Sequence, residues 1–158
     1  MTAPVPTGRL DGKDLLLTRT FRAPIEDVWK SITDSASTAR WYGPWKWDDK
    51  VGPGHPITIT MVHEDGAPAS KGVVERCEEP RHLAITSEWV DVEITLDQQG
   101  DTTTMTFVHH LPDRTLVGDF GPGWEYYLDM LVDAREGRPL RKFEAYYPAQ
   151  KAYFLALP

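Results

Sequence analysis

A regular apolar stripe on the predicted C-terminal helix limits the fold of this chain more than any other feature of its sequence. Between Trp124 and Arg135, apolar side chains recur at the spacing of one helical face: Trp124, Tyr127, Leu128, Leu131 and Val132. Gly137 and Pro139 are typical of a helix end. A stripe of this width must be buried against another element, and the segments before it have strand patterns. We therefore predict a sheet that packs one face on this helix.

Segments with the alternating pattern of strands precede the helix and are separated by short turns. The first covers residues 14–22, where Leu15, Leu17 and Phe21 share one face. The others cover residues 56–63, 70–78, 82–89, 91–97 and 102–110. Consecutive strands with short turns pair antiparallel. The predicted fold class is therefore α+β, with a curved antiparallel sheet of about six to seven strands around the long helix.

Two short helices and one loop complete the predicted fold. Residues 24–33 begin with a proline, carry acidic residues in the first turn and have one apolar stripe, a pattern typical of a helix. A second short helix extends to Arg40, and we expect both helices to lie at one end of the sheet. We expect Leu111 to Phe120 to form a loop, and Gly121-Pro122-Gly123 to mark the start of the final helix.

The chain of 158 residues suits one domain, flanked by two terminal segments. We expect residues 1–13 to be a flexible N-terminal arm, residues 14–136 to form the domain, and residues 137–158 to be a C-terminal extension. The extension is too aromatic for plain disorder, since it contains Phe143, Tyr146, Tyr147, Tyr153 and Phe154. We expect it to pack on the domain or on a partner.

The charge and the cysteine content exclude several classes of function. Lysine and arginine number 17 against 24 acidic residues, a formal net charge of -7, which argues against a nucleic-acid footprint and against binding to an anionic membrane. No stretch approaches the roughly 20 apolar residues of a membrane span, and the N-terminus has no signal-peptide pattern, so we expect a cytoplasmic protein. The single cysteine, Cys77, excludes an internal disulfide and gives no zinc pattern, and we expect no cofactor.

A series of short motifs runs through most of the chain in a familiar order. They are Leu17-Thr18-Arg19-Thr20-Phe21 with Ala23-Pro24, Arg40-Trp41-Tyr42-Gly43-Pro44, Gly72-Val73-Val74-Glu75 with Pro80-Arg81-His82-Leu83, Thr103 to His109, and Gly123-Trp124. In this order the motifs resemble the START-like or SRPBCC superfamily, also called helix-grip or Bet v-like. The chain is most similar to its AHSA-type branch, named for the activator of the HSP-90 chaperone ATPase. The resemblance implies the helix-grip fold and a groove, frequently hollow, between sheet and long helix.

Patterns for catalysis and for metal binding are weak. No histidine stands near a Gly-x-Ser-x-Gly motif, and Cys77 has no local nucleophile signature. His109 and His110 are adjacent, so on a strand they point to opposite faces and cannot both bind one ion. We therefore predict no metal site. The glycines around Pro122 have no lysine partner, so they indicate a helix start rather than a phosphate-binding loop.

The aromatic residues are the strongest functional signal, with six tryptophans in the chain. Core packing is the better interpretation for Trp29, because aromatic side chains dominate protein cores. For Trp41, Trp89 and Trp124 core packing stays open beside a second interpretation, because the resemblance implies positions that border the groove, and an apolar pocket with a few polar groups is typical of a small-molecule site. The predicted ligand-binding residues are Trp41, Met61, His63, Glu88, Trp89, Phe107, His109, Trp124 and Tyr127.

Three functions from different classes stay open. The first is binding of a small hydrophobic molecule (a lipid, an aromatic or a polyketide-like compound) without bond chemistry. The second is an enzyme of the cyclase or hydratase kind, with His109 or His63 as the acid–base group and Glu88 or Tyr127 as its partner. A carboxylate that orients the histidine would favour this enzyme. The third is a chaperone cofactor that acts through its surface, and the aromatic tail fits a homodimer contact equally well.

Overall fold

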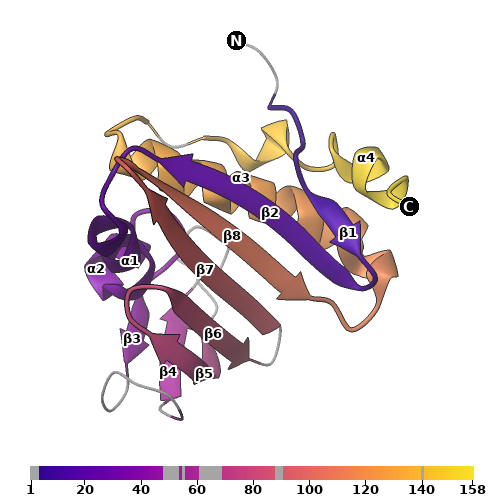
Figure 1. The fold of residues 1–158 in the computed structure, drawn as a ribbon. Helices are drawn as coiled ribbons and strands as arrows, with labels where there is room; N and C mark the ends of the chain where they lie inside the picture. The colour runs from indigo at the N-terminus through magenta and orange to yellow at the C-terminus, as the bar shows by residue number, and fades with distance from the viewer. Residues whose placement is uncertain (1–3, 48–53, 55, 61–68, 88–90, 140) are drawn as a thin grey trace.

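An antiparallel sheet and one long helix form the body of the protein (Figure 1). The structure is a computed structural model and describes residues 4–47, 54, 56–60, 69–87, 91–139 and 141–158. Within these residues the sheet has eight strands, in the order β1-β2-β8-β7-β6-β5-β4-β3. The strands are β1 (Arg9–Asp11), β2 (Asp14–Phe21), β3 (Trp45–Trp47), β4 (Pro56–Thr60), β5 (Ala69–Glu78), β6 (His82–Ser87), β7 (Asp91–Gln99) and β8 (Thr102–His110).

The helices lie against the sheet and at its ends. They are α1 (Ile25–Thr33), α2 (Ser35–Thr38), α3 (Val117–Arg135) and α4 (Lys151–Leu155), with 3₁₀ turns η1 (Arg114–Leu116) and η2 (Phe143–Ala145). In Figure 1, α3 runs along β2 and β8, while α1 and α2 lie near β3. The predicted fold class, a sheet around a long helix with two short helices at one end, is confirmed. Among the described helices, none is long and apolar enough to cross a membrane.

Two short strands bring the sheet to eight rather than six or seven. β1 lies within the segment expected to be a flexible arm, and Leu10 pairs with Leu15 of β2. β3 continues the other edge, where Trp45 pairs with Ile59 of β4. Each strand has three residues, too few to show the alternation on which a strand prediction depends. Their pairing is therefore decided by the neighbouring strands.

Helix α3 begins at Val117, so the prediction of a loop from Leu111 to Phe120 is wrong. The side chain of Asp113 accepts a hydrogen bond of 2.9 Å from the backbone N–H of Thr115 and caps the η1 turn that leads into the helix. Pro122 lies inside α3, although proline in a helix interior is unfavourable. Local sequence therefore indicates a break at this position, and tertiary packing overrides it.

The core lies between α3 and the concave face of the sheet. Leu128 and Leu131 of α3 are fully buried, as expected for the apolar stripe, while Val132 is only partly buried and Met130, outside the predicted stripe, is fully buried. The sheet contributes alternate residues from each strand, and paired rows such as Leu17, Phe107 and Ile94 cross β2, β8 and β7. Burial of such side chains contributes about 1.5–3 kcal/mol for each residue. The helix is therefore held mainly by apolar contact with the sheet.

Helices α1 and α2 are joined to the C-terminal end of α3 by two arginines. Arg135 donates hydrogen bonds to the carbonyl oxygen of Asp27 at 3.1 Å and to Oγ of Ser31 at 2.7 Å. Its guanidinium also lies over the ring of Phe21. Arg40 donates to the carbonyl oxygen of Ala134. Basic groups satisfy the last carbonyls of a helix and interact favourably with its dipole.

One flank of α3, beside its apolar stripe, carries three carboxylates at intervals of four residues: Glu125, Asp129 and Asp133. Arg19 of β2 pairs with Glu125 at 2.8 Å and with Asp129 at 3.1 Å. Arg141 pairs with Asp133 at 2.6 Å. Glu125 is 1% exposed and also accepts from the backbone N–H groups of residues 7 and 8. These pairs hold both terminal segments on the helix, because a buried carboxylate requires partners.

Three glycines form a socket for the C-terminal helix. A Cβ atom at Gly121 would lie 2.5 Å from Cγ of Phe154, and one at Gly8 would lie 2.6 Å from the same ring. At Gly118 it would lie 2.9 Å from Leu155. Phe154 is fully buried in this socket. The extension expected to pack on the domain or a partner thus lies against α3, and the glycines near Pro122 allow this close approach.

Replacement of Gly121 by alanine tests the socket. Alanine raises helix propensity by about 1 kcal/mol, but its Cβ would displace Phe154, so we expect a net loss of about 1–3 kcal/mol in the free energy of unfolding. Gly123→Ala is the matched control, since a Cβ at Gly123 meets no atom within 4 Å. Urea denaturation should show a loss of stability for Gly121→Ala and an unchanged or raised value for Gly123→Ala. Equal effects of the two substitutions would contradict the socket.

Candidate functional site

Aromatic side chains from distant parts of the sequence meet between α3 and the sheet. Trp124 of α3 lies 4.4 Å from Phe107 of β8 and 5.4 Å from Tyr42, between ring centroids. Tyr42 also contacts Tyr127 at 4.6 Å and Trp45 of β3 at 6.0 Å. We call this group the aromatic cluster, and its members are Trp41, Tyr42, Trp45, Phe107, His109, Phe120, Trp124 and Tyr127. Because the sheet curves around α3, residues of β3 and β8 belong to the same cluster.

Five of the nine predicted ligand-binding residues lie in this cluster: Trp41, Phe107, His109, Trp124 and Tyr127. Each of the five is at most 8% exposed. The other four, Met61, His63, Glu88 and Trp89, lie outside the described residues. The role of the five in ligand binding stays a prediction, but their gathering on one side of α3 is a property of the structure.

His109 is the polar centre of the cluster. It lies on the concave face of β8, paired with Val92 of β7 and Leu15 of β2. The indole Nε1–H of Trp124 donates a hydrogen bond of 2.9 Å to Nδ1 of His109. The ring of Phe120 stands edge-on to the imidazole at 4.6 Å. His109 is 1% exposed, so the imidazole is surrounded by aromatic and aliphatic groups.

The surroundings of His109 fix its protonation state. Burial lowers the pKa of His109 from its ordinary 6.5 to about 4, and the nearby His110 adds to the effect when it is charged. The ring is therefore neutral at pH 7. Since Nδ1 accepts from Trp124, the neutral ring carries its proton on Nε2. The site thus has an imidazole of fixed tautomer that can offer one N–H donor.

The adjacent His110 has the opposite surroundings. It lies on the outer face of β8, where Nδ1 is 2.8 Å from Asp14 and Nε2 is 2.9 Å from Glu93. His82 lies 2.9 Å from the other oxygen of Glu93. Partial burial lowers the pKa of His110, but hydrogen bonds to Asp14 and Glu93 outweigh burial and raise this pKa above its ordinary value. The prediction that the two neighbouring histidines point to opposite faces is confirmed.

Of the groups expected for acid–base chemistry, the described residues include His109 and Tyr127, both in the aromatic cluster. A catalytic imidazole is commonly oriented by a carboxylate on one ring nitrogen, and in His109 that nitrogen is taken by an indole. The proposed partner Glu88 lies outside the described residues. Among the residues that the structure describes, no group of histidine, cysteine and acidic side chains is arranged to hold a metal ion. The arrangement can bury an apolar body and form a small number of hydrogen bonds.

Sequence reasoning missed Tyr42, Trp45 and Phe120 as members of the cluster. Tyr42 and Trp45 belong to a run of four aromatic residues within seven positions, and that density was a usable signal. Phe120 falls in the segment that the sequence predicts as a loop, and only the earlier start of α3 places its ring on His109. Apolar periodicity predicts which side of α3 faces the sheet but not which side chains meet there.

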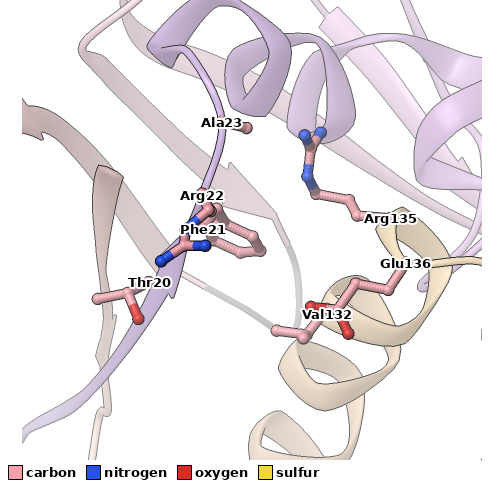
Figure 2. Close-up of a pocket in the computed structure, with 7 residues that line it drawn as sticks. All are labelled: Thr20, Phe21, Arg22, Ala23, Val132, Arg135 and Glu136. Atoms are coloured by element: carbon pink, nitrogen blue, oxygen red, sulfur yellow. The ribbon is translucent and has the colours of Figure 1, made fainter. Parts of the chain in front are cut away.

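A separate surface pocket of about 130 Å³ lies at the other end of α3 (Figure 2). It is lined by Thr20, Phe21, Arg22, Ala23, Val132, Arg135 and Glu136. Figure 2 shows the Arg135 side chain directed toward Ala23 and the neighbouring helix, where it forms the hydrogen bonds to α1 described above. None of the predicted site residues lines this pocket. It is a junction between β2, α1 and α3 and is distinct from the aromatic cluster.

The two histidines should give opposite pH dependences of stability. Below pH 6.5 the unfolded chain protonates His109 but the folded chain does so only near pH 4, so its stabilisation is complete above 6.5 and falls by about 3 kcal/mol as the pH is lowered to 4. For His110, whose folded pKa is raised, stabilisation is complete below 6.5 and is lost as the pH rises.

Chemical denaturation of wild type, His109→Leu and His110→Gln between pH 4 and 8 measures both effects. The stability difference between wild type and His109→Leu should shrink as the pH falls, while that between wild type and His110→Gln should shrink as the pH rises. A difference for His109→Leu that does not change with pH would show that His109 is not buried as a neutral ring.

The model of the family described as Activator of Hsp90 ATPase homolog 1-like protein matches residues 22–136. No curated protein sequence matches the chain. Among solved structures, CalU16 from Micromonospora echinospora is 26% identical, with a TM-score of 0.74 over 91% of this chain and 87% of CalU16.

Two further structures have the same fold. A protein from Bordetella parapertussis, encoded by the gene BPP1335, is 24% identical, with a TM-score of 0.72 over 98% of this chain and 92% of that protein. DynU16 is 20% identical, with a TM-score of 0.68, and the match covers 87% of this chain but 51% of DynU16. The AHSA-type resemblance drawn from the sequence is confirmed. The family match spans most of the chain, and the chain therefore belongs to the family of Activator of Hsp90 ATPase homolog 1-like proteins.

Proposed function

We propose that this protein binds a small, mainly apolar molecule between the sheet and α3, at the aromatic cluster. The observation that carries the proposal is the Trp124–His109 hydrogen bond inside a group of buried rings. Small-molecule sites are mostly apolar, with a few placed polar groups that fix the orientation of the ligand. Each 100 Å² of apolar ligand surface removed from water would contribute about 2.5 kcal/mol. The Nε2–H of His109 is the orienting donor in this proposal.

The comparisons support binding in a general way. One protein of the same fold, DynU16, is described as belonging to the dynemicin biosynthetic locus, so the fold occurs beside small-molecule biosynthesis. The family description refers to activation of a chaperone ATPase, a role that would act through the surface. Large exposed apolar side chains among the described residues are Val5, Val73, Phe143, Tyr153 and Leu155. We favour binding in the interior because the polar pair of the aromatic cluster, His109 and Trp124, is buried among its rings.

Tryptophan fluorescence and melting temperature, measured against fatty acids, flavonoids and polyketide-like aromatic compounds, test this function. A ligand that binds only the folded state at 100 times its Kd stabilises that state by about 2.7 kcal/mol. We expect one class to quench fluorescence and to raise the melting temperature. If no class does either, the interior is filled by its own side chains and the proposal fails.

Two tryptophan variants test whether the ligand binds at the aromatic cluster. Trp124 lies in the aromatic cluster, whereas Trp29 is a buried residue of α1 that has no ring contact with the cluster among the described residues. Trp124→Phe should reduce both quenching and affinity, because it also removes the hydrogen bond to His109. Trp29→Phe should preserve the affinity. Equal losses in the two variants would place the ligand elsewhere.

A further inference from the structure

Three buried side-chain atoms have no hydrogen-bond partner among the described residues: Nε1 of Trp45, Oγ of Ser70 and Oε1 of Gln150. Gln150 lies at the start of α4, where its amide nitrogen donates to the carbonyl oxygen of Pro4, whereas Trp45 and Ser70 lie on strands of the sheet. Trp45 is 3% exposed and Ser70 is 7% exposed. The great majority of buried polar groups in proteins are paired, because an unpaired group has lost its hydrogen bonds to water. Each exception therefore requires an explanation.

The two residues lie in one row across the sheet. Trp45 of β3 pairs with Ile59 of β4, and Ile59 pairs with Ser70 of β5. Their backbones are two strand spacings apart, about 10 Å. Ile59 is buried, and Ser70 alternates with buried Gly72 and Val74, so the row lies on the concave face. The ring of Trp45 contacts Trp41 and Tyr42, which joins the row to the aromatic cluster.

The other two indole N–H groups of the cluster form hydrogen bonds, whereas the N–H of Trp45 does not do so among the described residues. Nε1 of Trp41 donates to the carbonyl oxygen of Ser31 at 2.9 Å, and Nε1 of Trp124 donates to His109 at 2.9 Å. An indole N–H is a donor only, while a serine hydroxyl both donates and accepts. The unpaired set on this row is therefore one donor and one hydroxyl.

We propose that Trp45 Nε1 and Ser70 Oγ form a polar subsite for hydroxyl or carbonyl oxygens of an uncharged aromatic ligand. This inference rests on the proposed function and names its ligand class. The ligand must carry a hydrogen-bond acceptor because the indole N–H can only donate, and a hydroxyl or carbonyl oxygen also suits the hydroxyl of Ser70. Aromatic character follows from the rings of Trp41, Tyr42 and Trp45, whose faces and edges are in mutual contact.

The absence of charge on the ligand follows from the buried groups around it. Lysine and arginine do not occur among the buried polar residues that the structure describes: Ser31, Thr38, Ser70, Thr103, His109, Glu125, Asp133 and Gln150. Among the described residues, a carboxylate in this interior would have no buried cation to pair with, and an unpaired buried charge is strongly unfavourable. Fatty acids are therefore a worse fit than hydroxylated or carbonyl-bearing aromatic compounds.

The stability of the ligand-free protein tests whether Ser70 is unpaired. Ser70→Ala removes a hydroxyl without a partner, so the melting temperature should stay unchanged or rise. Thr103→Val is the matched control, because Oγ1 of Thr103 is buried and donates to the carbonyl oxygen of Ala23 at 2.8 Å. Its melting temperature should fall. A fall for Ser70→Ala as large as that for Thr103→Val would overturn the subsite.

Calorimetric titration at pH 7 with naphthalene, 2-naphthol and 2-naphthoate tests the ligand class. These probes share one ring system and differ in carrying no oxygen, one hydroxyl or a carboxylate. We expect 2-naphthol to bind most tightly and 2-naphthoate most weakly. In Ser70→Ala and in Trp45→Phe, the affinity for 2-naphthol should fall about three- to tenfold, while that for naphthalene should change little.

The outcomes separate this subsite from the general function. If none of the probes and none of the broader panel binds, the proposed function fails and the subsite fails with it. If naphthalene and 2-naphthol bind equally, and neither substitution changes their ratio, the interior binds ligands but the polar subsite is overturned. Tighter binding of 2-naphthoate would overturn the requirement for an uncharged ligand. Ser70→Ala keeps the test decisive if Trp45→Phe does not fold.

Discussion

Helix α3 is buried on two sides, and most of the other elements are held in position by their contacts with it. Its apolar side lies in the curve of the sheet, where Leu128 and Leu131 are fully buried. Its other side carries carboxylates that can be buried only when cations and N–H groups pair with them. Arg19, Arg141 and the backbone of residues 7 and 8 supply those partners. The sheet and both terminal segments therefore depend on the same helix.

The N-terminal half of α3 joins the terminal packing to the candidate site. Gly121 receives Phe154 on one side of the helix, and Trp124, three residues later, contacts Phe107 and His109 on the side of the sheet. The C-terminal extension thus helps to set the position of the residues that line the aromatic cluster. Close packing of this kind transmits small displacements, because protein interiors have few voids that can absorb them.

The two neighbouring histidines show how strongly the surroundings decide the chemistry of a residue type. His109 is neutral and accepts from an indole, while His110 lies between two carboxylates on the outer face. Strand alternation alone predicts that they face opposite sides. Which of them is buried depends on where α3 lies, and so does the sign of its effect on stability with pH. The proposed subsite at Trp45 and Ser70 likewise depends on strands that are distant in sequence.

The sequence by itself determined the class of this fold and the face of α3 that is buried, because apolar periodicity is a local property that survives in any context. It also carried the AHSA-type resemblance through ordered motifs. It did not predict β1, β3 or the start of α3, since short strands take their pairing from neighbours, and α3 continues through Pro122 in a segment where Gly118 and Gly121 pack on α4. Only the tertiary structure brought Trp45, Ser70 and His109 onto one concave surface, because the curvature of a sheet is a collective property of paired strands.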